Sequence, residues 1–221
     1  MKPVYCLLAV GVALAGGCAT ESHQVVEPSR VAAASRPYAG VKSALVVGKF
    51  NNRSHYLQGI FSDGVDRLGG QAKTILMAHL QQTGRFSVMD RDNLEETKQE
   101  TALKGQQQKL KAADFAVTGD VTEFGRKETG GEALFGILGS GKRQVAYAKV
   151  TLNVVDATTS EVVFSVQGAG EYALENREVL GSGSTAGYDS TLNGKVLDLA
   201  VRQAVDGLVE GMESGKWGGG R

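Results

Sequence analysis

The sequence predicts an α/β (α+β) fold, a mixed sheet with helices packed on it in the order β-α-β-α-β-β-β-α. From Ala146 to Val154 every second residue is small or apolar, which is the pattern of a strand with one buried face. Residues 71–83 and 192–212 instead carry apolar residues at helical spacing. Strands and helices therefore interleave along one chain, and no internal repeat is visible.

Residues 1–17 are typical of a lipoprotein signal peptide. Lys2 precedes an apolar run, residues 4–14, that is too short to span a bilayer as a stable helix. The run ends in Leu-Ala-Gly-Gly-Cys, which is similar to a bacterial lipobox and predicts lipid attachment at Cys18. The residue after Cys18 is Ala19 and not Asp, which is typical of lipoproteins that are sent to the outer membrane. The alternative is an ordinary cleaved signal followed by an incidental cysteine.

The rest of the chain divides into three parts. Residues 18–42 are small and polar and contain two prolines, which predicts a lipidated, flexible tether. Residues 43–214 form the α/β domain. Residues 215–221 form a tail, in which Trp217 is a candidate to dock on the domain.

The elements of the domain follow from apolar periodicity and from turn residues. The first helix is stopped by Gly84, and Asp92 with Glu95 forms an N-cap and capping-box pair for the second helix. The expected elements are strands at residues 43–50, 86–89, 113–124, 143–155 and 162–166, and helices at residues 71–83, 92 to about 103, and 192–212.

Three connections are long enough to suggest a function. Two Gly-rich β-hairpin excursions leave the sheet, at about residues 123–149 and 166–190. A polar, glycine-bearing loop at residues 51–70 is long for a compact domain. We expect the function of the protein to depend on these segments.

Neither composition nor motifs indicate an enzyme, a cofactor or a metal site. The net charge is zero with 22% charged residues, which gives no sign of nucleic acid as a partner. Residues 136–143 match a phosphate-binding loop except at the last position, where Arg replaces the required Ser or Thr. His23, His55 and His79 have no second ligand at metal-binding spacing, and we expect His79 on a helix flank. Cys18 is the only cysteine after signal cleavage, which excludes disulfides within the chain.

Gly207 and Gly211 lie one turn apart at the flank of the apolar stripe of the last helix. Small residues at this spacing allow close approach, either to a neighbouring subunit or to the protein's own sheet. The second interpretation is favoured.

Taken together, the segments resemble the curli production assembly/transport lipoproteins, the CsgG/HfaB family. The resemblance covers nearly the whole mature chain, and the order and spacing of its segments carry it. The segments that match are the lipobox at Cys18, the strand at residues 45–50 with its following loop, and residues 80–91, 112–124 and 154–162.

The resemblance implies a periplasmic domain that is lipid-anchored to the outer membrane and assembles into a ring with like subunits. In the curli exporter each subunit contributes two hairpins to a membrane barrel that passes unfolded fibre subunits. The two excursions would be these hairpins. The loop at residues 51–70 would line the constriction, with Tyr56, Phe61 and Asp63 as candidates.

Two functional hypotheses follow. The first is an oligomeric ring or channel that exports or anchors surface material, with an exported protein as substrate and other envelope lipoproteins as possible components. The second is a tethered periplasmic lipoprotein that binds and regulates an envelope partner, such as a cell-wall synthase, without forming a pore. The charges of Arg126, Lys127 and Glu128 favour the second, because they fall on both faces of a strand that would need one apolar face.

Overall fold

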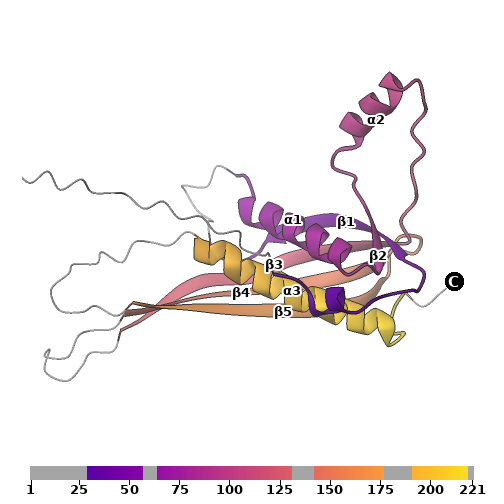
Figure 1. Cartoon of the computed structure of the whole chain (residues 1–221). Coiled ribbons are helices and arrows are strands. Elements are labelled where there is room, and N and C mark those ends of the chain that lie inside the picture. The colour runs from indigo at the N-terminus through magenta and orange to yellow at the C-terminus, as the bar shows by residue number, and fades with distance from the viewer. Residues whose placement is uncertain (1–28, 57–63, 131–141, 177–190, 219–221) are drawn as a thin grey trace, which may run out of the picture.

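The computed structural model describes residues 29–56, 64–130, 142–176 and 191–218, and it confirms the predicted order of elements. The structure contains the 3₁₀ helix η1 (Ala32–Ser35), β1 (Ser43–Asn52), α1 (Arg67–Gln82), β2 (Phe86–Met89), α2 (Leu94–Leu103), β3 (Phe115–Gly130), β4 (Lys142–Asp156), β5 (Val162–Asn176) and α3 (Thr191–Glu213) (Figure 1).

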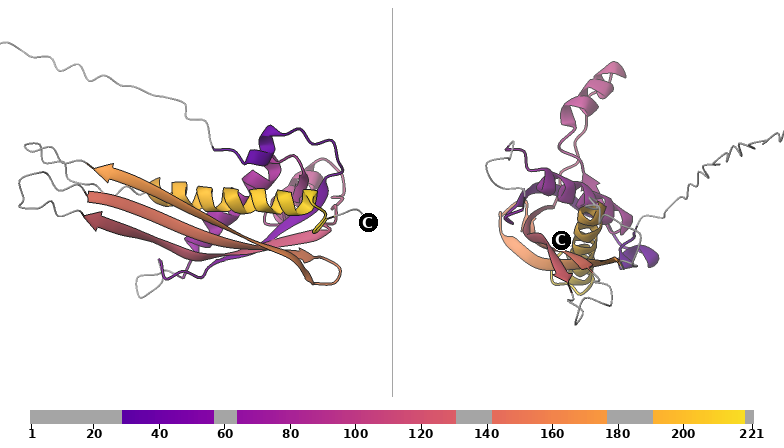
Figure 2. Two further views of the ribbon diagram at one scale, coloured as in Figure 1. Left: turned by 90° about the horizontal axis from the view of Figure 1, so that it is seen from below. Right: turned by 90° about the vertical axis from the view of Figure 1, so that its left-hand side faces the viewer.

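The strands form one mixed sheet in the order β2-β1-β3-β4-β5. β1 runs parallel to both β2 and β3, whereas β4 is antiparallel to β3 and to β5. The parallel part is connected through helices and the antiparallel part is a meander, as such pairings require. Helices α1 and α3 lie side by side on one face of this sheet (Figure 2).

The long strands correct the predicted excursions. β3 and β4 form the two arms of the first hairpin, which are paired out to Gly130 and Lys142 with one register shift between Val121 and Glu123, and the tip lies outside the described residues. The predicted return strand at residues 162–166 is too short, because β5 continues to Asn176. A second hairpin within residues 166–190 is not seen, since residues 177–190 also lie outside the described part.

Glycines on β5 explain why the full length of this strand is not apparent from the sequence. Gly168 and Gly170 suggest a loop by composition, but they face α3 at very short range. A Cβ on Gly168 would lie 2.1 Å from the carbonyl oxygen of Ala200, and one on Gly170 would lie 2.6 Å from that of Val196. Glycine is needed at these positions because the backbones of helix and strand nearly touch.

Glycines on α3 complete the same contact. A Cβ on Gly207 would lie 2.6 Å from the side chain of Val166, and one on Gly211 would lie 2.5 Å from the ring of Phe164. Both partners belong to β5. The interpretation of these glycines as close packing on the protein's own sheet is therefore confirmed.

Trp217 docks after the last helix and is 4% exposed. Its indole N–H donates to the carbonyl oxygen of Leu208 at 3.0 Å. Its ring lies within 6.2 Å, centroid to centroid, of Phe86, Phe115 and Phe164. Residues from β2, β3 and β5 thus meet around one aromatic side chain, which makes Trp217 part of the core.

His79 corrects another expectation, since it is 3% exposed and does not lie on a helix flank. Its Nε2 lies 2.8 Å from Asp198 Oδ1, and its Nδ1 lies 3.2 Å from Gln82 Oε1. The ring therefore joins α1 to α3. α1 itself begins at Arg67, before the expected residue 71, because Asp66 accepts a hydrogen bond from the backbone N–H of Gly69.

A buried arginine ties the N-terminal segment to the end of α3. The guanidinium of Arg85 donates to the carbonyl oxygens of Ala33 and Thr83 at 2.9 and 2.8 Å, and to the carboxylate of Glu213 at 2.5 Å. These partners satisfy a charge that would otherwise be costly to bury.

Helix α2 forms as predicted, but the expected packing on the sheet is wrong. It contains no buried residue and projects from the body (Figure 1). The predicted capping box of Asp92 and Glu95 is also wrong, since Asn93 is the N-cap and makes no side-chain cap bond. Asp90 accepts bonds from the backbone of Asp92 and Asn93 instead.

We expect Gly168→Val to destabilise the fold by about 1–3 kcal/mol or more, because the new side chain would meet the backbone of α3. The matched control is Gly70→Ala in α1, where a Cβ meets nothing within 4 Å. It should stabilise the protein by about 0.5–1 kcal/mol. Urea unfolding followed by the fluorescence of the single tryptophan measures both. Equal midpoints for the two variants would contradict the close contact.

Candidate functional site: the extended end of the sheet

Three strands continue together past the region where the sheet is complete. β1 makes its last pair with β3 at Val121, whereas β3 runs on to Gly130. Over this length each β3 residue from Glu123 onward still pairs with β4, and β4 with β5. We call this three-stranded part, residues 122–130 with their partners on β4 and β5, the ribbon. It projects at one end of the molecule, beyond the start of α3 (Figures 1 and 2).

Neither long edge of the ribbon has a strand partner within the described chain. β5 is the last strand of the sheet, and no described strand pairs with β3 on its β1 side after Val121. At the base of the β5 edge, the backbone N–H of Ala169 donates to Gln203 Oε1 of α3 at 2.6 Å. An open edge presents a row of backbone N–H and C=O groups that can pair with another strand. The ribbon can therefore extend its sheet on either side.

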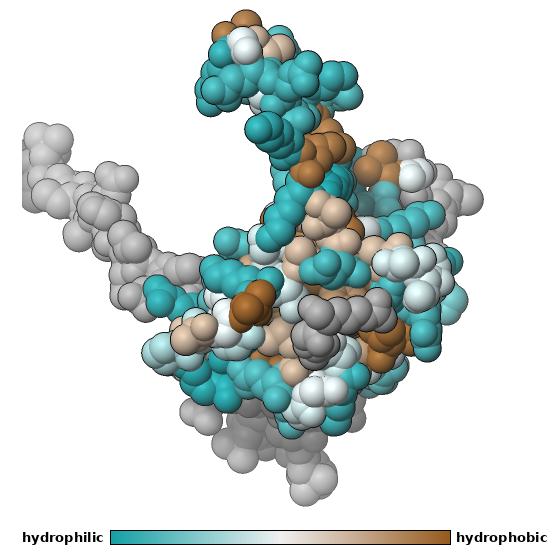
Figure 3. Space-filling model, turned by 90° about the vertical axis from the view of Figure 1, so that its right-hand side faces the viewer, coloured by the Kyte–Doolittle hydropathy of each residue, from teal (hydrophilic) through white to brown (hydrophobic). Residues whose placement is uncertain are grey.

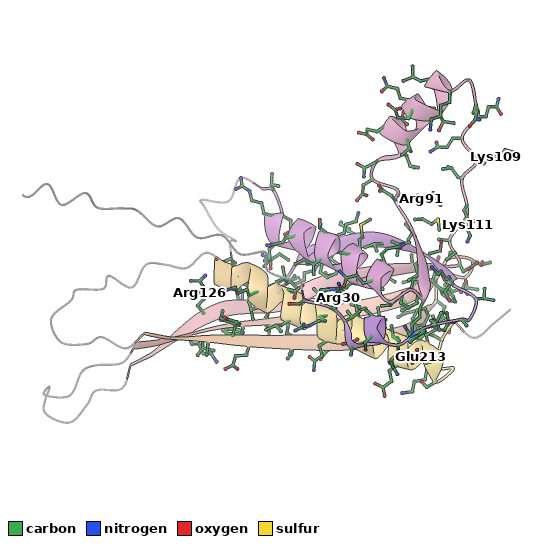
Figure 4. The ribbon with its side chains drawn as sticks, in the orientation of Figure 1. Arg30, Arg91, Lys109, Lys111, Arg126 and Glu213 are labelled. Carbon is green, nitrogen blue, oxygen red and sulfur yellow. The ribbon has the colours of Figure 1, made fainter. Side chains whose placement is uncertain are left out.

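A polar network holds the base of the ribbon against α3. Arg126 of β3 donates from Nε and Nη2 to Asn193 Oδ1 at 3.0 and 2.9 Å. Asn193 in turn donates from Nδ2 to the hydroxyl of Tyr56 at 2.7 Å. Figure 4 shows Arg126 beside the first turn of α3. The network joins the segment after β1, the ribbon and the last helix.

The predicted site residues are only partly within the described chain. Tyr56 is half-buried, and its ring lies 4.7 Å from that of Phe124 on β3. This contact places Tyr56 at the base of the ribbon, while its role in a constriction stays a prediction. Phe61, Asp63 and the lipid attachment residue Cys18 lie outside the described residues.

The ribbon's two faces differ in chemistry. Arg126 lies on the α3 side, where Asn193 binds it. On the opposite side the ring of Tyr147 covers Gly125, and the ammonium of Lys127 lies 5.1 Å from the centre of that ring. Two of the three charges that break the apolar pattern are therefore held by specific partners.

The described residues contain no candidate metal centre. No group of three His, Cys, Asp or Glu side chains in them could hold a metal ion. Of the helices in that part of the chain, none has the length and apolar character to cross a bilayer. The features that distinguish the described structure are the strand edges of the ribbon and the polar residues at its base.

The family model of the curli production assembly/transport component CsgG matches residues 28–220. The chain belongs to this family. The match confirms the resemblance seen in the sequence. A relative in Neisseria meningitidis serogroup B, named Putative lipoprotein NMB1126/NMB1164, is 59% identical over 211 residues, which are 96% of this chain and 94% of the relative.

Several solved structures are similar to the CsgG-family chain at low identity. The PelC dodecamer from Paraburkholderia phytofirmans is 14% identical, with a TM-score of 0.37 over 77% of this chain and 91% of its own. Lipoprotein GNA1162 from Neisseria meningitidis is 14% identical, with a TM-score of 0.36 over 79% and 99%. The LpoB C-terminal domain from Salmonella enterica is 16% identical, with a TM-score of 0.32 over 59% and 85%. No role for this chain follows from scores of this size.

We expect Asn193→Ala to loosen the base of the ribbon, because it removes the acceptor of Arg126 and the donor to Tyr56 together. The loss should amount to about 1–3 kcal/mol of local stability. Tyr56→Phe, which removes the hydroxyl that accepts from Asn193, should cost about 0.5–1.5 kcal/mol. Hydrogen exchange at the first turns of α3 and at residues 122–127 measures both. Unchanged protection in Asn193→Ala would show that the network does not hold the ribbon.

Proposed function

We propose that the protein is an outer-membrane lipoprotein of a secretion or assembly system, whose subunits form an oligomeric ring or channel for export or anchoring of surface material. The observation that carries the proposal is the ribbon with its two open edges. A strand edge left unpaired is a liability in a monomer, and pairing edges around a ring removes it. Membership of the CsgG family supports the same function.

The anchor supports the location. A lipid on Cys18 would hold the chain at the membrane, and the relative that is 59% identical is named as a lipoprotein. Stable anchoring needs more than one acyl chain or an added interaction. Ring formation by anchored subunits would supply this added interaction, because the lipids of all subunits then hold the same assembly at the membrane. The role we propose requires no catalysis and no cofactor.

A specific observation also favours the second function, a regulator that binds an envelope partner. Lys127 and Glu128 lie on the ribbon, and a charge on a lipid-facing strand costs up to about 2–4 kcal/mol at the bilayer midplane for Arg or Lys. A ribbon that stays in the periplasm avoids this cost. It would then present its edges to a protein partner.

Electron microscopy of the full-length lipidated protein in mild detergent, with single-channel conductance on the same sample, decides between these functions. We expect rings that conduct. Rings without conductance would support the proposed assembly and contradict the proposed channel. Monomers at membrane concentrations would overturn the whole proposal.

We expect Cys18→Ser to release the protein from the outer membrane, because serine lacks the thiol that takes up the lipid. Membrane fractionation of cells that express the variant and the unaltered chain measures the loss. The folded domain should persist in the soluble fraction, which near-ultraviolet circular dichroism of Trp217 checks. Retention of the variant in the outer membrane would show that anchoring does not depend on Cys18.

A further inference from the structure

An apolar row crosses the face of the sheet that α1 and α3 do not cover. Met89, Val46, Ala116 and Val155 are successive cross-strand partners on β2, β1, β3 and β4. All four are partly exposed, and none belongs to the core cluster or packs against it. We call them the outer row. At the β5 end the row reaches Val162, which is 55% exposed.

The connection of the strands shows which helix would usually cover this face. The crossover from β1 through α1 leads to β2 on one side of β1. The crossover from β2 through α2 runs in the opposite direction, past β1 to β3. Right-handed crossovers in opposite directions place their helices on opposite faces. By this rule α2 belongs over the outer row. It instead projects from the body without a buried residue (Figure 1).

We call the projecting segment, residues 90–113, the α2 arm. Hydrogen bonds within the arm hold it together. At its base Asn93 donates from Nδ2 to Asp90 Oδ2 at 2.6 Å, and this bond is the main reason that the pKa of Asp90 lies below its usual value. The two legs of the arm are tied together, since Arg91 donates to the carbonyl oxygen of Lys111 at 2.6 Å. Figure 4 shows these residues along the legs.

The arm exposes leucines flanked by lysines. Leu103, at the end of α2, is 76% exposed, and Leu110, in the returning leg, is 58% exposed. Lys104 follows the first, while Lys109 and Lys111 flank the second. Figure 3 shows apolar surface at the far end of the arm and on its stem. An isolated helix of ten residues is marginal in water, so the arm gains stability when these leucines are covered.

The outer row has the complementary chemistry. Asp114 is exposed directly before β3, at the end of the strand that carries Ala116, and its Oδ2 accepts a hydrogen bond from the backbone N–H of Ala44 at 3.4 Å. Glu161 is exposed directly before Val162. Carboxylates therefore border the apolar row as lysines border the leucines of the arm. Such pairing fixes the orientation of a contact more than it adds affinity.

We propose that the α2 arm of one copy docks on the outer row of a second copy, with Leu103 and Leu110 on the row and the lysines toward Asp114 and Glu161. The arm's own row is not the occupant, because both legs start beside it, at Met89 and Phe115, and the bond of Arg91 to Lys111 keeps the two legs together there. Arm and row are different surfaces, so the contact is head-to-tail and can close into a ring. The inference rests on the proposed oligomer and names its interface.

A crosslinking experiment tests the contact in the full-length lipidated protein extracted in mild detergent. Leu103→Cys is combined with Ala116→Cys in one chain, and a short bismaleimide joins thiols that lie close together. The unaltered chain gives the background, because the sequence holds no cysteine after Cys18. The matched control combines Ala116→Cys with Val41→Cys, at a position that is 91% exposed and outside the arm.

We expect a ladder of crosslinked oligomers from the first pair and none from the control. Leu103→Asp with Leu110→Asp, at exposed positions that leave the fold intact, should abolish rings in electron microscopy. Rings without the ladder, or equal ladders from both pairs, would overturn the arm contact while the proposed ring stands. A crosslink within single chains would show that the arm closes on its own row. Monomers in every sample would overturn both proposals.

Discussion

The packing of α3 on β5 is the interaction on which the rest of this structure depends. Gly168 and Gly170 let the helix approach the strand at backbone distance, and Gly207 and Gly211 let the strand's side chains approach the helix. With the helix fixed at this distance, three further links form along it. Its first turn binds the ribbon, Asp198 in its N-terminal half binds His79 of α1, and its end binds Arg85. One close contact thus positions both ends of the molecule.

The order of elements could be predicted because it depends on local periodicity. The alternation along β4 and the apolar stripe of α3 reflect burial on one face, and both survive in the structure. The partner of His79 lies 119 residues away in sequence, so no local pattern reveals that its ring is buried. β5 was predicted too short for a related reason, since composition cannot distinguish a loop glycine from one that faces a helix.

The candidate site was predictable in outline only. Glycine-rich sequence marked the segments that leave the sheet, yet the three-stranded ribbon and its open edges depend on where β1 stops. The link of Tyr56 to Arg126 passes through Asn193, a residue with no distinguishing sequence context. Helix α2 shows the converse. Its sequence predicts the helix, but only the fold reveals that the helix projects away from the face that it would usually cover.

The docking of Trp217 has a consequence for the time at which the fold is completed. A chain that emerges N-terminus first, from a ribosome or across a membrane, exposes Phe86, Phe115 and Phe164 well before the residue that packs among them. The core therefore closes only when Trp217 has been delivered. Until then α3 lacks its terminal anchor, and the chain remains in a form that can still be threaded, held by a chaperone or degraded.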